Sequence, residues 1–230
     1  MHPFKVILWD IDGTLLNFHM AEAAAIRALF QKFNLGICTD EMLKDYSGIN
    51  ATFWKLLEAG KMTKPQILTG RFETFFQKYN LDTSCVTAFN DAYQLALGDT
   101  ICFNPGALET ITAIKGNLLQ CAVTNGTLIA QKKKLALSGL DKLFDGIFIS
   151  DVIGAEKPHP DFFDAVWKEI GHYPPEEVLI VGDSLTSDIR GGNNIGIRTC
   201  WYNPSGNPAP DDIHIDFEIS EISQVLDIIH

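Results

Sequence analysis

Paired cysteines, metal-binding cysteine motifs and internal repeats are all missing from this chain of 230 residues. Its five cysteines are an odd number, widely spaced and without a Cys-x-x-Cys pair. Neither a disulfide framework nor a cysteine-ligated zinc site is therefore expected. We predict that the cysteines are reduced thiols.

Long apolar runs and an excess of positive charge are missing as well. No apolar stretch approaches the roughly 18 residues that a membrane span needs, and Asp10 interrupts the first apolar segment before a signal-peptide core could develop. Acidic residues outnumber basic ones by 29 to 18, giving a formal net charge of -11. Such a body repels nucleic acid and anionic membranes, so we expect a cytoplasmic protein with neither as a partner.

Hydrophobic residues make up 46% of the chain, which is enough to build a core, and many stand in short uninterrupted runs. Such runs are typical of strands buried on both faces of a parallel sheet. We predict these strands at 6–9, 119–123, 147–149, 178–181 and 197–202. Helices with a glycine at or near their ends are predicted at 129–137, 161–170 and 187–194. The alternation predicts an α/β fold with a doubly wound parallel sheet, Rossmann-like in its core.

The segment between the first two strands is too long for one crossover and has the periodicity of helices. Helices are predicted there at 21–33, 41–46, 52–59, 65–79 and 87–97. We interpret residues 17–97 as a helical cap inserted into a core made of residues 1–16 and 98–230. Asn104-Pro105-Gly106 is predicted to form the N-cap and first turn of the helix that re-enters the core. Residues 203–212 are predicted to be a surface loop before a short closing strand and helix.

Carboxylates follow two of the predicted strands. Asp10 and Asp12 end the first strand, and Asp183 and Asp188 follow the fourth. If these strands are neighbours, all four acids meet at the edge where open α/β sheets bind ligands. Crowded like charges repel unless a cation neutralises them, and an oxygen-only ligand set favours Mg²⁺. The competing interpretation is that Asp and Gly simply form turns and that acids favour helix N-termini.

Two further motifs are informative mainly in combination. Thr124-Asn125-Gly126 ends the second strand and offers a hydroxyl and N–H groups where a helix begins, which is a natural site for an anion. Taken alone, it is equally well explained as a turn with a capping threonine. Lys157 stands in a loop with prolines at positions 158 and 160, which restrain the backbone more than a solvated lysine requires.

In this order, Asp-x-Asp-Gly-Thr, Thr-Asn-Gly, Lys-Pro and Gly-Asp-Ser-x-x-x-Asp resemble the haloacid dehalogenase superfamily of phosphohydrolases over essentially the whole chain. The insertion resembles that family's helical cap. The resemblance implies that Asp10 is the nucleophile and forms an aspartyl-phosphate. It also implies that Asp12 first protonates the leaving oxygen and then activates water.

The same resemblance implies how the cofactor and substrate are held. The implied Mg²⁺ ligands are Asp10, the main-chain oxygen of Asp12, Asp183, and Asp188 acting directly or through water. The implied phosphate-binding residues are Thr124, Asn125 and Lys157.

Residues 181–204 are similar to the pyrimidine 5′-nucleotidase branch of that family. The similarity lies in a Gly-Gly-x-Asn-x-Gly run at 191–196 and a Thr-Cys-Trp-x-Asn strand end at 199–203. We therefore expect a Mg²⁺-dependent phosphomonoester hydrolase whose partner is a small phosphate ester, a nucleoside 5′-monophosphate. The candidates to flank its base or sugar are Phe18, His19, Phe53, Trp54, Phe103 and Asn104. For the aromatic residues, packing within a small helical cap is the competing explanation.

Other activities remain as alternatives. A phosphosugar mutase or a sugar-phosphate phosphatase would use the same scaffold. Dehalogenase activity conflicts with Asp12, because the family's dehalogenases lack this second aspartate, and phosphonatase activity would need a cap lysine for a Schiff base. A catalytically idle binding protein is disfavoured because it has no reason to keep four crowded carboxylates together with Thr124 and Lys157. The composition marks no dimer surface.

Overall fold

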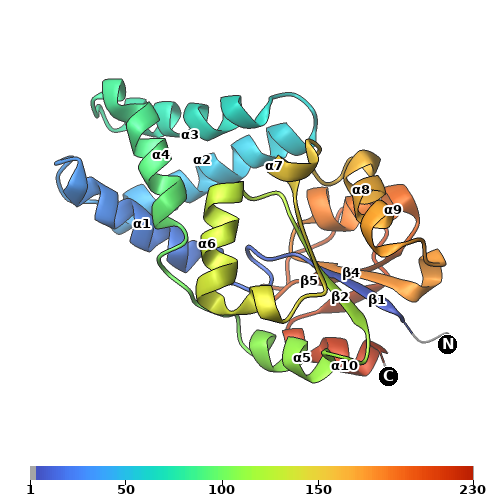
Figure 1. The fold of residues 1–230 in the computed structure, drawn as a ribbon. Coiled ribbons are helices and arrows are strands. Elements are labelled where there is room, and N and C mark those ends of the chain that lie inside the picture. The colour runs from blue at the N-terminus through green and yellow to red at the C-terminus, as the bar shows by residue number, and fades with distance from the viewer. Residues whose placement is uncertain (1–3, 230) are drawn as a thin grey trace.

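The computed structural model of the protein describes residues 4–229 and contains a six-stranded parallel sheet between layers of helices (Figure 1). The strand order is β3-β2-β1-β4-β5-β6. The strands are β1 (Val6–Trp9), β2 (Leu119–Thr124), β3 (Gly146–Ile149), β4 (Val178–Gly182), β5 (Arg198–Tyr202) and β6 (Phe217–Ile219). All five predicted strands are present, and β6 is the predicted short closing strand. Residues 1–3 and 230 of the predicted core lie outside the described residues.

Helices cover both faces of the sheet, which explains the uninterrupted apolar strands. In β1, Ile7 and Trp9 face one hydrophobic cluster while Val6 and Leu8 face another, and all four are fully buried. The first cluster includes residues of α5 and α10, and the second includes residues of α8. The core helices are α5 (Ala107–Ile114), α6 (Leu128–Ser138), α7 (Ser150–Ile153), α8 (Pro160–Ile170), α9 (Arg190–Ile195) and α10 (Val225–Ile229).

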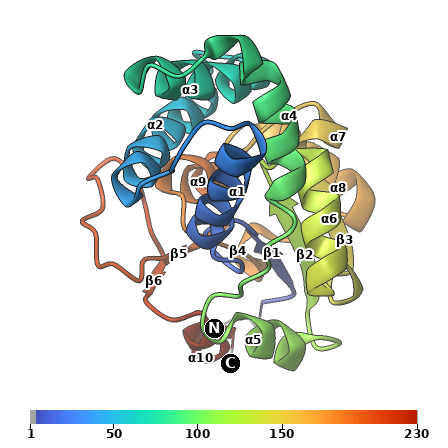
Figure 2. The same cartoon turned by 90° about the vertical axis from the view of Figure 1, so that its left-hand side faces the viewer.

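Four helices follow β1 and form a layer beyond the end of that strand (Figure 2). They are α1 (Phe18–Lys32), α2 (Asp40–Glu58), α3 (Lys64–Lys78) and α4 (Val86–Ala96). They share an aromatic core, in which the Phe72 ring stacks on Tyr46 with centroids 4.9 Å apart. This layer is the helical cap of the predicted fold, and its division from the core at residues 16/17 and 97/98 stays a prediction.

The two connections between the core and the cap run side by side. The Asn17 N–H donates to the carbonyl of Cys102 at 2.8 Å, and the Asn104 N–H donates to the carbonyl of Leu15 at 2.9 Å. An antiparallel bridge between Leu16 and Phe103 joins the same segments. The two chain connections between the cap and the core are therefore hydrogen-bonded to each other.

The prediction of two helices at 41–46 and 52–59 was wrong, because α2 is continuous from Asp40 to Glu58. Gly48 lies inside this helix, but a glycine in a helix interior costs only about 1 kcal/mol. Buried Asn50 offsets that cost, since its side chain donates to Glu22 at 2.9 Å and accepts from Arg71 at 2.8 Å. Tertiary contacts thus override the local signal.

The prediction that Asn104 is a helix N-cap was also wrong. Helix α5 begins at Ala107, with Gly106 as its N-cap at φ 74°. Asn104 instead opens a tight turn, which the Ala107 N–H closes by donating to the Asn104 carbonyl at 3.1 Å. Its side chain is used elsewhere, in the loop that follows β1.

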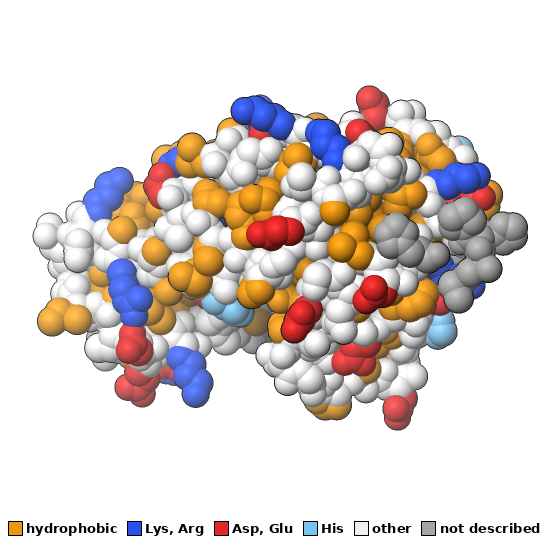
Figure 3. Space-filling view, turned by 90° about the horizontal axis from the view of Figure 1, so that it is seen from below, with side chains coloured by type: hydrophobic (Ala, Val, Ile, Leu, Met, Phe, Trp, Pro, Cys, Tyr) orange, Lys and Arg blue, Asp and Glu red, His pale blue; other side chains and the backbone are white. Residues whose placement is uncertain are grey.

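Between residues 4 and 229, no helix combines the length and the apolar composition needed to cross a membrane. On the face seen in Figure 3, acidic, basic and apolar side chains are interspersed.

Asp216 lies just before the edge strand β6 and makes hydrogen bonds to the neighbouring strand β5. Its carboxylate accepts from the Thr199 N–H at 2.9 Å and from the Thr199 hydroxyl at 3.1 Å, and it pairs with Arg198 at 2.5 Å. Burial alone would raise the pKa of Asp216, but these donors outweigh it and hold the pKa below the usual 3.8.

We predict that Asp216→Asn lowers the free energy of unfolding by about 1–2 kcal/mol at pH 7, because it removes charge-assisted hydrogen bonds. A folded-state pKa below the unfolded value stabilises the protein above the unfolded pKa, and this contribution disappears as pH falls through the folded pKa. Urea denaturation from pH 7 down to pH 3, with exposed Asp211→Asn as the control, measures it. A difference that is independent of pH contradicts the prediction.

Candidate active site

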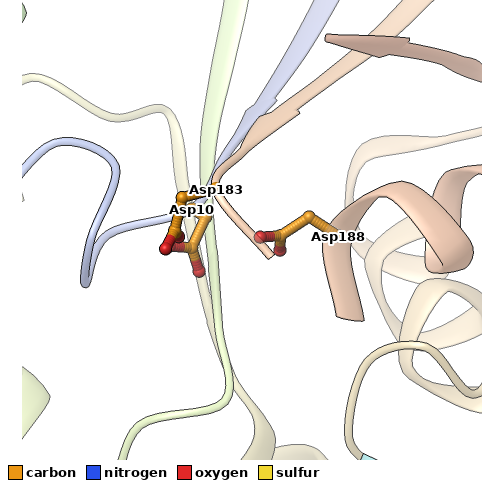
Figure 4. Close-up of side chains that lie close together, drawn as sticks. All are labelled: Asp10, Asp183 and Asp188. Atoms are coloured by element: carbon orange, nitrogen blue, oxygen red, sulfur yellow. The ribbon is translucent and has the colours of Figure 1, made fainter. Parts of the chain in front are cut away.

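The ends of β1 and β4 bring acidic residues together. These strands pair in parallel, and the Asp10 N–H donates to the Val181 carbonyl at 2.9 Å, so the chain emerges side by side after both strands. Carboxylate oxygens of Asp10, Asp183 and Asp188 lie within 4.8 Å of one another. Figure 4 shows the Asp188 carboxylate pointing toward the other two. We call these three residues the acidic cluster.

Two glycines make room for the acidic cluster. Gly13 has φ 100°, and a Cβ atom there would lie 2.5 Å from Asp183 Oδ2. A Cβ atom on Gly182 would lie 2.2 Å from Asp188 Oδ2. Any other residue at either position would displace a carboxylate or strain the loop. The glycines next to the acidic residues in the sequence are therefore needed for close approach as well as for turning the chain.

Lys157, in the loop between α7 and α8, contacts two residues of the acidic cluster. Its side chain is completely buried, and its ammonium donates to Asp10 Oδ1 at 2.8 Å, Asp188 Oδ1 at 2.6 Å and the Val123 carbonyl at 2.6 Å. These contacts use all three donors of the ammonium. Burial alone would lower the pKa of Lys157, but the two carboxylates outweigh it and raise the pKa.

The second motif supports Lys157 from β2. The Asn125 amide donates to the Lys157 carbonyl at 2.8 Å and accepts from the Lys157 N–H at 2.8 Å. The Asn125 side-chain oxygen and one amide hydrogen are therefore engaged with protein, which leaves the second amide hydrogen and the main-chain N–H to offer an anion. The neighbouring Thr124 hydroxyl accepts from the Gly126 N–H at 3.0 Å and keeps its own proton for donation.

Asp12 lies in the same loop, but its side chain turns toward α6. Its carboxylate accepts from Gln131 Nε2 at 2.6 Å and from Lys134 Nζ at 2.5 Å. Both partners are buried, and Lys134 also lies with its ammonium 5.2 Å from the centroid of the Phe18 ring. Sequence reasoning missed Gln131 and Lys134. Their signal would have been a Gln and a Lys one turn apart on a helix that begins directly after the Thr-Asn-Gly motif.

Burial and nearby negative charge raise the pKa values of Asp10 and Asp183. Burial raises the pKa of Asp10 well above its usual range, and the Asp188 charge adds to this while Lys157 opposes it. Solvent reaches one side of Asp183, but the protein packed around its carboxyl still raises its pKa to about 7, again helped by Asp188. A cation would relieve this repulsion. Three carboxylate oxygens at this spacing, without His or Cys, are donors that fit a hard divalent cation.

The six candidate substrate-flanking residues fall into two groups, and the first group is Phe18, His19 and Trp54. The Phe18 ring covers Lys134, and His19 is exposed, with Nδ1 3.3 Å from the Ser47 hydroxyl. His19 lines an open recess of about 540 Å³ between α1 and α2. Trp54 of α2 is half-buried, and it belongs to none of the hydrophobic clusters formed by the described residues.

The second group, Phe53, Phe103 and Asn104, packs against or hydrogen-bonds to other parts of the protein. The Phe53 ring lies where a Cβ atom on Gly70 would meet it at 2.7 Å, so this ring packs on α3. Phe103 packs against the core of the sheet. Asn104 is buried, and its side-chain amide donates to the carbonyls of Gly13 at 3.0 Å and Thr14 at 2.7 Å. Asn104 thus holds the loop that carries Asp12.

Sequence reasoning also missed Glu58, the last residue of α2. Its carboxylate accepts a hydrogen bond from the Thr186 hydroxyl, which lies in a π-helical turn (Leu185–Ile189) that follows Asp183 and contains Asp188. Burial raises the pKa of Glu58 to about 7, and the Thr186 hydroxyl acts in the opposite direction. No sequence motif marks this residue, because its place depends on how the cap sits over the core.

Comparison with known proteins gives consistent results. A family model described as haloacid dehalogenase-like hydrolase matches residues 4–196. The HAD-hydrolase YfnB of Bacillus subtilis is 34% identical over 230 residues, covering 100% of this chain and 97% of that protein. A solved structure of YfnB bound to magnesium, described as revealing interdomain movement, matches with a TM-score of 0.93 at 33% identity, over 99% of both chains.

Two further relatives carry names that specify a substrate. Pyrimidine 5′-nucleotidase PynA of Streptococcus pneumoniae is 33% identical over 227 residues, which is 97% of this chain and 94% of PynA. Pyrimidine 5′-nucleotidase YjjG of Escherichia coli is 31% identical over 219 residues, 95% of each protein.

We predict that Asn104→Ala destabilises the protein by about 1–3 kcal/mol, because it removes the donor of the buried Thr14 carbonyl and of the part-buried Gly13 carbonyl. Asn117→Ala is the matched control: Asn117 is exposed and its amide also donates to a carbonyl, so that change should stay within about 0.5 kcal/mol. Urea denaturation of both variants measures the difference. Equal stabilities would show that Asn104 does not hold the loop.

Proposed function

The chain belongs to the haloacid dehalogenase-like hydrolase family, as its motifs predicted, and on that basis we propose that it is a Mg²⁺-dependent phosphatase of nucleoside 5′-monophosphates. The observation that carries the proposal is the position of Asp10. Its carboxylate lies within the acidic cluster, held by the Lys157 ammonium at 2.8 Å and the Thr14 hydroxyl at 3.2 Å. A carboxylate fixed in this way is suited to attack phosphorus.

The proposed reaction has two steps. Asp10 attacks phosphorus and forms an aspartyl-phosphate, while the ester oxygen leaves and takes a proton from Asp12. Asp12 then removes a proton from a water molecule, which attacks the same phosphorus, so phosphate is released and Asp10 is regenerated. This role requires the Asp12 carboxyl to turn away from Gln131 and Lys134, which it contacts in this structure.

The remaining residues bind the ion and the phosphoryl group. We assign Mg²⁺ to Asp10, Asp183 and the main-chain oxygen of Asp12, with Asp188 beside them. When bound, Mg²⁺ supplies positive charge that offsets the carboxylates and the phosphoryl oxygens. The Thr124 hydroxyl and the N–H groups after β2 donate to the phosphoryl oxygens, and Lys157 orients Asp10.

Nucleoside monophosphates are the proposed substrates because of the names of two relatives. Two relatives that match over nearly their full length are named pyrimidine 5′-nucleotidases. The motif at 199–203 also has a structural use that helps form the site, since the Trp201 indole donates to the Asp183 carbonyl at 2.9 Å. That contact supports the loop of the acidic cluster whichever ester is bound, so the substrate itself has to be tested directly.

A panel of phosphate esters tests the proposal. Uridine 5′-monophosphate, glucose 6-phosphate and 4-nitrophenyl phosphate are assayed with Mg²⁺ and with EDTA. We expect hydrolysis of uridine 5′-monophosphate to exceed that of the sugar phosphate, to stop in EDTA, and to be absent in Asp10→Asn. Activity in Asp10→Asn would refute the nucleophile, and preference for glucose 6-phosphate would refute the substrate class.

We predict that Asp12→Asn slows hydrolysis of uridine 5′-monophosphate by roughly 10²–10⁴, the usual contribution of acid–base catalysis. With 4-nitrophenyl phosphate the leaving group needs no proton, so Asp10 should still be phosphorylated quickly. A burst of 4-nitrophenol equal to the enzyme concentration should then precede slow turnover in a stopped-flow trace. A variant that slows both substrates equally and shows no burst contradicts the role of Asp12 as the base for water.

A further inference from the structure

Glu58 carries a charge near the acidic cluster that the proposed reaction does not use. It ends α2 in the cap, and its carboxylate accepts from the Thr186 hydroxyl in the core. Thr186 itself lies between Asp183 and Asp188 and contacts the Ser184 hydroxyl at 3.3 Å. Glu58 therefore joins the cap to the segment that carries two residues of the acidic cluster.

One face of α2 extends from the Glu58 contact with Thr186 to the Ser47 contact with His19. Ser47, Ala51, Trp54 and Glu58 follow one another at helical spacing, so they share that face. At one end Ser47 contacts His19 in the first turn of α1, and at the other end Glu58 contacts Thr186. The eleven helical steps from Ser47 to Glu58 span about 16 Å, which is long enough to lie along a nucleoside.

In the proposed reaction, the leaving group of a substrate lies against this face of α2. Displacement at phosphorus is in line, so the leaving oxygen lies on the side of phosphorus opposite Asp10. Thr124 and Lys157 are buried residues of the core. Because they lie on the core side of the site, the leaving group faces the cap. A carboxylate at this position accepts hydrogen bonds from donors, and it repels any additional anion.

We propose that Glu58 determines specificity by accepting a hydrogen bond from a hydroxyl of a neutral leaving group, such as a ribose, and by rejecting leaving groups that carry a second negative charge. This inference rests on the proposed function and narrows it. Carboxylates bind ribose hydroxyls in this way in dinucleotide-binding folds. Esters whose leaving group bears a carboxylate or another phosphate are excluded.

The first test uses Glu58→Gln, which keeps the shape and removes the charge. Uridine 5′-monophosphate, 2-phosphoglycolate and 4-nitrophenyl phosphate are compared by kcat/KM at pH 8.5, above the Glu58 pKa of about 7. We expect roughly a tenfold loss with the nucleotide and roughly a tenfold gain with 2-phosphoglycolate. The value for 4-nitrophenyl phosphate, which has neither a hydroxyl nor a second anion, should stay unchanged.

A second substrate isolates the hydrogen bond. With 2′,3′-dideoxyuridine 5′-monophosphate, wild-type and Glu58→Gln enzymes should have the same kcat/KM, because the hydroxyls are absent. Glu73→Gln, an exposed acid on α3, is the matched control and should change none of these values.

The outcomes separate the two proposals. Equal losses of kcat/KM on all esters would show that Glu58 supports the fold alone, and no change on any ester would refute the inference outright. If the wild-type enzyme hydrolyses 4-nitrophenyl phosphate but no nucleotide, the proposed substrate class fails. The ratio of 2-phosphoglycolate to 4-nitrophenyl phosphate activity then still decides whether Glu58 rejects anions.

Discussion

The buried ammonium of Lys157 is the interaction on which the site depends. It connects the ends of three strands or their loops by donating to Asp10 after β1, to the Val123 carbonyl in β2 and to Asp188 after β4. Removing one partner of such a buried group leaves a charge without compensation, which is far more costly than an exposed ion pair is worth. The sheet order, with β1 between β2 and β4, is what allows one lysine to reach all three.

Polar contacts help to join the cap to the core, beside the apolar contact that Ala130 of α6 makes with the hydrophobic cluster of the cap. Lys64 of α3 donates to the Ser150 hydroxyl at 2.6 Å and to Asp151 at 2.7 Å, and the Thr127 hydroxyl donates to Gln94 of α4 at 2.8 Å. Exchanging such a hydrogen bond for one with water costs little net free energy. Exposing buried apolar surface to water costs more. Such an interface suits a cap that excludes water during phosphoryl transfer and opens to release product.

The sequence predicts the parts of the site that depend on strand ends. Asp10 and Asp183 could be placed together because carboxyl ends of neighbouring parallel strands meet at one edge. The same reasoning failed for residues on helices. Lys134 and Glu58 approach the site only because α6 and the cap pack in one orientation, and no local pattern encodes that orientation. For Asn104, turn propensity predicted a helix cap, whereas burial under the loop after β1 determined its contacts.

The most direct test of the account is a crystal structure grown with Mg²⁺ and beryllium trifluoride, which mimics an aspartyl-phosphate. The account predicts beryllium bonded to a carboxylate oxygen of Asp10 and one Mg²⁺ ion that contacts both Asp10 and Asp183. It also predicts fluorine atoms within hydrogen-bonding distance of the Thr124 hydroxyl. Beryllium fluoride bound elsewhere, or an acidic cluster without Mg²⁺ at a saturating concentration, would contradict it.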